Sequence, residues 1–369
     1  GTTMVKLAAN GRHVVFRSRA NDLVAGDTNT ADDVFVRDLQ TQTTVRVNVL
    51  ANGSQDIVSA GTTGLGADIS ADGRKVLMRS AANLAGDGAA TAGYRWYLRD
   101  LDAGVTRLVA GSEDGQGAAL SPDGRYVAFI TVTSSPAQNR LMLYDDQGGS
   151  TSQLLAVPSG AFPEGLGGGL AVSDGAGAIA FWLRSSSVGG GAAAQYSQIG
   201  VFERSSGSVS IASVTAGGMA GDGHSSDPSL SRDGRYVSFR SAAPNLSGDP
   251  ASAVGSYLIV RDRQAGTTRI ASRRPDGTPF LSQQGFNENA LSADGSAVVH
   301  LADAGEAVPG ALGGIQVQVG LTIGYAIAPI DSQDGAGLIK LADAAMYSGK
   351  QSGKFCVRRN TGDLALSSA

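Results

Sequence analysis

A short pattern recurs six times along the chain and constrains the fold more than any other feature: an extended apolar segment, an Asn-Gly or Asp-Gly pair, and a second extended segment. Asn, Asp and Gly tolerate the positive φ that a two-residue hairpin turn needs. In the copy "LSRDGRYVSFRS", Val237 and Phe239 face one way and Ser238 faces the other, which is the period of a strand. The pattern therefore predicts a hairpin at each copy. The turn residues are Asn10, Asp72, Asp123, Asp174, Asp233 and Asp294.

A second module follows each hairpin. It starts at Ala20 with "ANDLVAGDTNTADDVFVRDLQTQTTVRVNV", and related stretches start at Ala81 and Ala243, whereas the third and fourth copies are shorter. The module contains a loop, a strand ending in Arg-Asp, a turn and a Thr-rich strand. We expect each Asp to cap the turn and each Arg to bridge to the next repeat. Four short antiparallel strands per repeat match one blade of a β-propeller.

The sixth repeat lacks its Arg-Asp strand. After "SAVVHLA" the sequence continues as "DAGEAVPGALGG" over Asp303–Gly314, and the alternating stretch Ile315–Pro329 is a candidate to complete the blade. The amino-acid composition also changes near this point, since three of the five lysines fall in the last thirty residues. The sequence predicts an all-β, six-bladed propeller over residues 1–312, with an atypical sixth blade, followed by a short α+β tail over residues 313–369.

Composition excludes several classes of function. The net charge of −4 includes no basic stripe, which argues against nucleic-acid binding. No apolar run approaches the roughly 18 residues that span a bilayer. Cys356 is the single cysteine, so an internal disulfide is impossible. The chain begins at Gly1 without an initiator Met or a signal peptide, and we interpret it as a mature product or a piece of a longer sequence.

The Ser-x-Asp-Gly-Arg-x-Val-x-Phe hairpin, followed by a Val-x-Val-Arg-Asp strand, resembles the TolB-like, WD40-like (PD40) propeller repeat of bacterial proteins over residues 1–305. The resemblance implies a protein-binding platform of the bacterial envelope, or a non-catalytic domain beside a hydrolase. It also implies a periplasmic or extracellular location.

The tail resembles the end of a GGDEF domain, the fold of diguanylate cyclases. Leu321–Gly324 matches a strand of that family, and Leu341–Tyr347, "LADAAMY", matches its last helix. By this resemblance Lys350 and Lys354 fall on basic positions that contact nucleotide phosphates in active members. The family's Gly-Gly-Asp/Glu-Glu-Phe hairpin and metal-binding aspartate are missing upstream. Because phosphoryl transfer depends on metal ions held by carboxylates, we expect no cyclase activity. If the tail is native to the protein, a cytoplasmic location is the alternative.

Two further sites are candidates. In "GDTNTADD", Asp27, Asn29 and Asp33 alternate as oxygen ligands of Ca²⁺ could, although an ordinary Asx-rich turn also explains them. His224 lies in a loop near Asp222 and Asp227, as a Ser-His-Asp site would require. No Gly-x-Ser-x-Gly elbow accompanies it.

We therefore expect a non-catalytic propeller that binds a protein, peptide or glycan partner, without nucleic acid and without a cofactor other than this calcium ion. The alternatives are a cyclase-inactive signalling protein with a propeller sensor and a GGDEF-like tail, and a propeller hydrolase.

Overall fold

The structure is a computed structural model, and the chain divides into two compact units, Gly1–Ile315 and Gln316–Ala369. The structure describes residues 3–29, 31–55, 67–88, 93–112, 117–134, 137–158, 169–184, 196–248, 255–273, 277–281, 289–300, 323–325 and 357–359.

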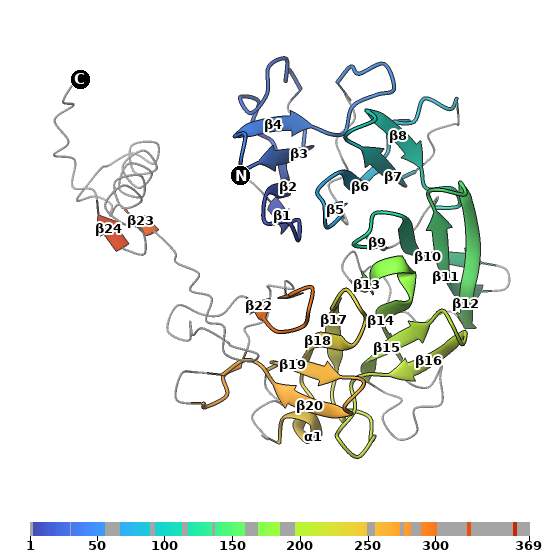
Figure 1. The fold of residues 1–369 in the computed structure, drawn as a ribbon, viewed down its shortest axis with the longest axis vertical. Helices are drawn as coiled ribbons and strands as arrows, with labels where there is room; N and C mark the ends of the chain where they lie inside the picture. Colours follow the sequence, from blue (N-terminus) through green and yellow to red (C-terminus); the bar gives the residue numbers. More distant parts are fainter. Residues whose placement is uncertain are drawn as a thin grey trace. The chain divides into compact units, whose positions relative to one another are not determined.

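The first unit contains five four-stranded antiparallel sheets, each built from one continuous segment with its strands in chain order (Figure 1). We call these sheets blades 1 to 5. Blade 1 has β1 (Thr3–Leu7), β2 (His13–Ser18), β3 (Asp33–Asp38) and β4 (Thr43–Arg46). Blade 2 has β5 (Ala67–Ile69), β6 (Lys75–Ser80), β7 (Arg95–Asp100) and β8 (Val105–Leu108). Blade 3 has β9 (Ala118–Leu120), β10 (Tyr126–Ser134), β11 (Ala137–Asp145) and β12 (Ser150–Pro158).

Blade 4 has β13 (Leu170–Val172), a 3₁₀ turn η1 (Asp174–Ala176), β14 (Ala178–Arg184), β15 (Ser197–Glu203) and β16 (Ser208–Ile211). Blade 5 has β17 (Ser225–Leu230), β18 (Tyr236–Ser241), the helical turn α1 (Pro244–Ser247), β19 (Tyr257–Asp262) and β20 (Thr267–Ile270). The first strands of successive blades contact one another, from β1 with β5 through to β17 with β21 (Asn289–Leu291). Sheets whose first strands share an axis in this way define a β-propeller.

The predicted hairpins are present in the described blades. The turn glycines adopt positive φ, for example 72° at Gly234, between Leu230 and its partner Val237. Blade 4 differs, because its turn is displaced by one residue from the predicted Asp174. The Ala176 amide donates to the Ser173 carbonyl, as Gly234 does to Ser231, so Ala176 takes the glycine position, with φ 52°.

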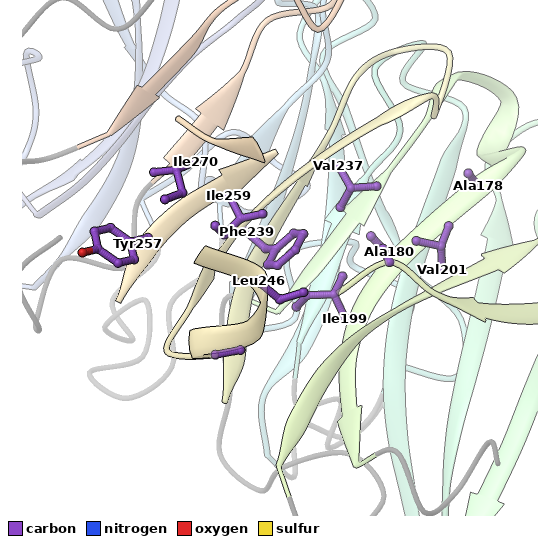
Figure 2. Close-up of a cluster of buried hydrophobic side chains, with 12 residues drawn as sticks. Ala178, Ala180, Ile199, Val201, Val237, Phe239, Leu246, Tyr257, Ile259 and Ile270 are labelled. Atoms are coloured by element: carbon purple, nitrogen blue, oxygen red, sulfur yellow. The ribbon is translucent and has the colours of Figure 1, made fainter. Parts of the chain in front are cut away.

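Buried apolar side chains fill the interfaces between neighbouring blades. Figure 2 shows the cluster between blades 4 and 5, in which Ile199 of one blade lies near Phe239 of the next. Phe239 has no exposed surface. The cluster also takes in Leu246 from α1, whose end is capped by Gly248 in the left-handed conformation. Side-chain packing between sheets therefore joins the blades.

Blade 3 has the longest strands of the propeller. Its second module lacks the long loop of the other copies, so β10 and β11 continue pairing as far as Ser134 and Ala137. The shorter sequence thus lengthens the strands to nine residues each.

The prediction of six blades is corrected to five complete blades. Among the described residues, the sixth repeat forms a two-stranded hairpin of β21 and β22 (Val298–His300). In the second unit, β23 (Ile323–Tyr325) pairs in parallel with β24 (Val357–Arg359). This part of the candidate stretch Ile315–Pro329 therefore pairs with β24, whereas the rest of that stretch and Asp303–Gly314 lie outside the described residues.

Candidate functional site

The two ends of each blade are built differently. At one end, the first two strands and the last two strands are joined by tight turns, and we call this the turn end. At the other end lie the loops between the second and third strands and the linkers to the next blade, and we call this the loop end. The repeated polar residues of the sequence gather at the turn end.

An arginine–aspartate clamp links the two tight turns within a blade. In blade 3, Arg125 Nε and Nη2 donate to the two carboxylate oxygens of Asp145, at 2.9 and 2.8 Å. This bidentate contact is the main cause that lowers the pKa of Asp145 to about 2. Arg12 with Asp38 and Arg235 with Asp262 form the same clamp, and each arginine holds the aspartate pKa well below its usual range.

The expected turn caps are confirmed. Asp262 Oδ1 accepts hydrogen bonds from the backbone N–H groups of Gln264 and Ala265. The neighbouring arginine does not behave as expected. Arg261 donates to Thr268 of its own blade and, at 3.4 Å, to the Thr215 carbonyl in the linker between blades 4 and 5. The shorter hydrogen bonds of Arg261 and Asp262 therefore stabilise the turn of their own blade.

Hydrogen bonds also run from turn to turn between neighbouring blades. The backbone N–H of Asn10 donates to the Ala71 carbonyl, and the backbone N–H of Ala71 donates to the Pro122 carbonyl. The Gly175 amide donates to the Asp123 carboxylate. The last two links run from Asp174 to Arg232 and from Arg232 to Ala293. The turn end is therefore tied together from the first repeat to the sixth.

Sequence reasoning missed a buried hydrogen bond that recurs at the loop end. A side-chain oxygen just beyond the fourth strand accepts the N–H of a residue at the start of the third strand. In blade 1, Asn48 accepts from Val34 at 2.9 Å, and in blade 5, Ser272 accepts from Leu258 at 3.1 Å. Ser112 and Ser213 do the same in blades 2 and 4. The signal available in the sequence was a Ser or Asn shortly after each Thr-rich strand.

The predicted calcium residues lie at the loop end of blade 1, and the structure brings two of them, Asp27 and Asp33, to Arg46. Arg46 Nη1 is 3.2 Å from Asp27 Oδ1 and 3.5 Å from Asp33 Oδ2. Asn48 donates to Asp33 at 2.6 Å, and Asn29 accepts the Ala31 amide. The guanidinium thus lies where it neutralises both carboxylates.

Burial raises the pKa of Asp33, against the lowering effect of the Asn48 hydrogen bond and of the Arg46 charge. Across the described part of the chain, no group of three or more His, Cys, Asp or Glu side chains is arranged to hold a metal ion. Calcium at Asp27, Asn29 and Asp33 stays a prediction, and Arg46 is the cation that the structure places there.

The candidate hydrolase residues each bind a different partner. His224 Nδ1 accepts the Ser197 amide N–H at 3.1 Å and lies 3.2 Å from Ser197 Oγ. Asp222 accepts the Asn245 amide, while Asp227 is buried and accepts from Ser226. The structure therefore brings a serine hydroxyl to His224, whereas the contacts described for Asp222 and Asp227 are with other residues and do not form the relay of a Ser-His-Asp site.

Lys350 and Lys354 lie outside the described residues. In the ranges that the structure does describe, no helix has the length and apolar character needed to cross a bilayer.

No protein-family model matches the chain, and no curated protein matches it. Among solved structures, TolB from Acinetobacter baumannii is 16% identical, with a TM-score of 0.43, over 73% of this chain and 53% of that chain. The β-propeller domain of the Trilobed protease from Pyrococcus furiosus is 10% identical, with a TM-score of 0.43, over 73% of this chain and 70% of that domain.

An oligogalacturonate lyase in complex with manganese is 14% identical, with a TM-score of 0.48, over 82% of this chain and 71% of that chain. The chain spans about half the length of the TolB structure. The fold class is that of a β-propeller, and this assignment rests on the blades themselves.

Proposed function

We propose that the chain is a non-catalytic propeller that binds a protein, peptide or glycan partner through its loop end. The observation that carries the proposal is the contrast between the two ends. At the turn end, the recurrent arginines and aspartates are engaged in clamps and in links between blades. The loop end differs in sequence and structure from blade to blade, from the Arg46 cluster of blade 1 to α1 of blade 5. Variable loops on a rigid scaffold are the usual place for recognition.

The test compares bulky adducts at the two ends of the full-length chain. With Cys356→Ser as background, a cysteine is introduced at the exposed His224 of the loop end or at the exposed Gln147 of the turn end. Each protein is coupled to a polyethylene glycol maleimide and used to capture partners from the source organism and from a glycan array. We expect the loop-end adduct to abolish specific capture and the turn-end adduct to preserve it. Equal capture by both would reject the loop end as the binding face.

The membership of the repeat in the TolB-like family and the periplasmic or extracellular location are part of the same proposal. They are supported by the Asp-Gly-Arg hairpin and the Arg-Asp strand. Cell fractionation of the source organism tests the location.

The GGDEF-like tail and the hydrolase remain alternative proposals. The parallel pairing of β23 with β24 fits a strand–helix–strand connection, which the tail sequence predicts. An assay of GTP conversion by the purified chain tests the first alternative. A fluorogenic peptidase and esterase panel on wild type and His224→Ala tests the second.

A further inference from the structure

The chain contains two Asn-Gly dipeptides, Asn10-Gly11 and Asn52-Gly53. Both lie in the same kind of turn, because the glycine N–H donates to the carbonyl three residues earlier, at 2.9 Å in the first dipeptide and 2.8 Å in the second. Both glycines have positive φ, 66° and 81°. Both asparagines are exposed. Turn geometry and accessibility therefore do not distinguish the two sites.

The side-chain carbonyl oxygens of the two asparagines are also held alike. Asn10 Oδ1 accepts the backbone N–H groups of Arg12 and His13, at 2.9 and 3.2 Å. Asn52 Oδ1 accepts the N–H and the O–H of Ser54, at 3.0 and 2.7 Å. Two donors on a carbonyl oxygen stabilise the negative charge that develops there when a nucleophile attacks its carbon. Both side chains are therefore prepared for attack at Cγ.

The two sites differ at the side-chain nitrogen. Asn10 Nδ2 donates to the Asp72 carbonyl of blade 2 at 2.8 Å and to His13 Nδ1 at 2.9 Å. Among the residues that the structure describes, Asn52 Nδ2 has no hydrogen-bond partner, and Ser54 alone holds that side chain. Reorientation of Asn10 must break contacts with the neighbouring blade, whereas reorientation of Asn52 breaks contacts within its own turn only.

We propose that Asn52 is a site of spontaneous modification, at which Asn52-Gly53 converts to aspartyl-glycine and isoaspartyl-glycine, while the fold protects Asn10. The backbone nitrogen of Gly53 gives its proton to a base in the solvent and attacks Asn52 Cγ, which it reaches without hindrance because glycine has no side chain. The new N–C bond closes a succinimide ring, and the side-chain nitrogen takes up a proton and leaves as ammonia. Water then adds to either ring carbonyl and opens the ring. The net reaction exchanges ammonia for water.

The modification would act on the loop end of blade 1. Asn52 lies in the linker between blades 1 and 2. Nearby in this linker, Gln55 Oε1 accepts the N–H and the O–H of Thr28, at 3.2 and 3.1 Å, and Gln55 Nε2 donates to Asp27 at 3.2 Å. In the isoaspartyl product the main chain runs through Cγ and gains a carbon atom, which displaces the residues that follow. We therefore expect the contacts of Gln55 with Thr28 and Asp27 to loosen, next to a new negative charge.

The test follows both sites in the full-length chain, incubated in mildly alkaline buffer and sampled over days to weeks. Tryptic peptides 7–12 and 47–74 carry the two sites separately. Tandem mass spectrometry with electron transfer locates the change within each peptide and distinguishes aspartate from isoaspartate. We expect Asn52 to react at least about tenfold faster than Asn10, because two further hydrogen bonds must break before Asn10 reorients.

Three controls separate the effect of the fold from that of the sequence. In concentrated urea both turns are lost, so the rates at Asn10 and Asn52 should become similar. His13→Ala removes one acceptor from Asn10 Nδ2 and should accelerate Asn10 about threefold while leaving Asn52 unchanged. Asn52→Gln lengthens the side chain, so that attack would have to close a larger ring, and the reaction at position 52 should stop.

Hydrogen exchange supplies an independent measurement. The Thr28 amide, which donates to Gln55, should exchange faster in the aged chain than in the fresh chain. The proposal is overturned if Asn52 does not react, if Asn10 reacts as fast as Asn52 in the folded chain, or if the difference between them persists in urea. None of these measurements needs a binding partner, so their outcome is independent of the proposed function.

Discussion

Blade 1 and blade 5 carry the same repeat, yet they bury it to different extents. Phe239 of blade 5 has no exposed surface and lies near Ile199 of blade 4, as Figure 2 shows, whereas Phe16 at the same position is half-buried and stacks on Phe35 of its own blade, with ring centroids 5.7 Å apart. The repeat sequence alone therefore does not decide how deeply the phenylalanine at this position is buried. A blade is buried by its predecessor, and blade 1 has no complete predecessor in the described part of the chain.

The two blades also differ on their fourth strands. Ile270 of blade 5 pairs with Ile259, while Arg46 of blade 1 pairs with Phe35 and binds Asp27 and Asp33. Blade 1 thus uses an ion cluster where blade 5 uses apolar packing.

The largest expected effect tests burial directly. Phe239→Ala should lower the free energy of unfolding by about 3–5 kcal/mol, because it leaves a cavity in a fully packed interface. Phe16→Ala should cost about half as much or less, because its ring is partly exposed and its site can relax. Urea unfolding of both variants measures the difference. Equal losses would mean that the apolar face of β1 and β2, where Leu7 is 55% exposed, is covered in solution.

The next effect tests the ion cluster of blade 1. Arg46→Leu introduces the residue type of the other blades, but it leaves Asp27 and Asp33 without their cation. We expect a loss of about 3 kcal/mol, since breaking one side of a buried ion pair leaves a buried charge. Ca²⁺ should restore part of this stability in Arg46→Leu while changing wild type little, because only the variant has carboxylates that lack a counter-ion. Thermal unfolding of both proteins in Ca²⁺ and in EDTA measures this difference in stability. A similar stabilisation of wild type by Ca²⁺ would support a native calcium site.

A smaller effect compares two turn glycines. Gly11 of blade 1 and Gly73 of blade 2 both have positive φ, at 66° and 77°. A Cβ at Gly11 would meet nothing within 4 Å, whereas at Gly73 it would overlap the His13 ring and lie 2.7 Å from His13 Cβ. Gly11→Ala should cost about 1 kcal/mol for backbone strain.

Gly73→Ala should cost about 1–3 kcal/mol more than Gly11→Ala, because the turn and His13 of the preceding blade must separate. Ala176 shows that a Cβ is tolerated at this turn position where the neighbour leaves room. Equal values for the two alanine variants would show that the contact between turns adjusts without cost.

The smallest effect concerns the clamp in blade 3. The folded-state pKa of Asp145 is about 2, below the value of about 3.9 for an unfolded chain, so its contribution is present above pH 4 and is lost as the pH falls toward 2. Arg125→Ala should lower the free energy of unfolding only slightly at pH 7, because the pair is partly exposed and solvent screens it. The stability curves of wild type and variant should converge near pH 2. Parallel curves down to pH 2 would assign the loss to packing of the arginine stem.

Local sequence predicted the hairpins well, since an Asx-Gly turn between alternating strands depends on residues within a few positions of one another. The register Leu230 with Val237 follows from it. The turn of blade 4 was misplaced by one residue, because Ala176 adopts a positive φ that sequence rules assign to glycine. The calcium hypothesis came from the spacing of Asp27, Asn29 and Asp33, whereas Arg46, which binds two of them, is more than ten residues away.

The sequence by itself determined the repeat, the four-stranded unit and the residues that alternate toward the core, because a β-strand and its turn are encoded by short-range period and by φ preferences. The tertiary structure decided which arginine clamps which aspartate, how neighbouring turns are linked, and which copy of the repeat keeps an exposed apolar face. Those features depend on the blade that lies alongside, and copies of one pattern are equivalent until packing gives them different neighbours.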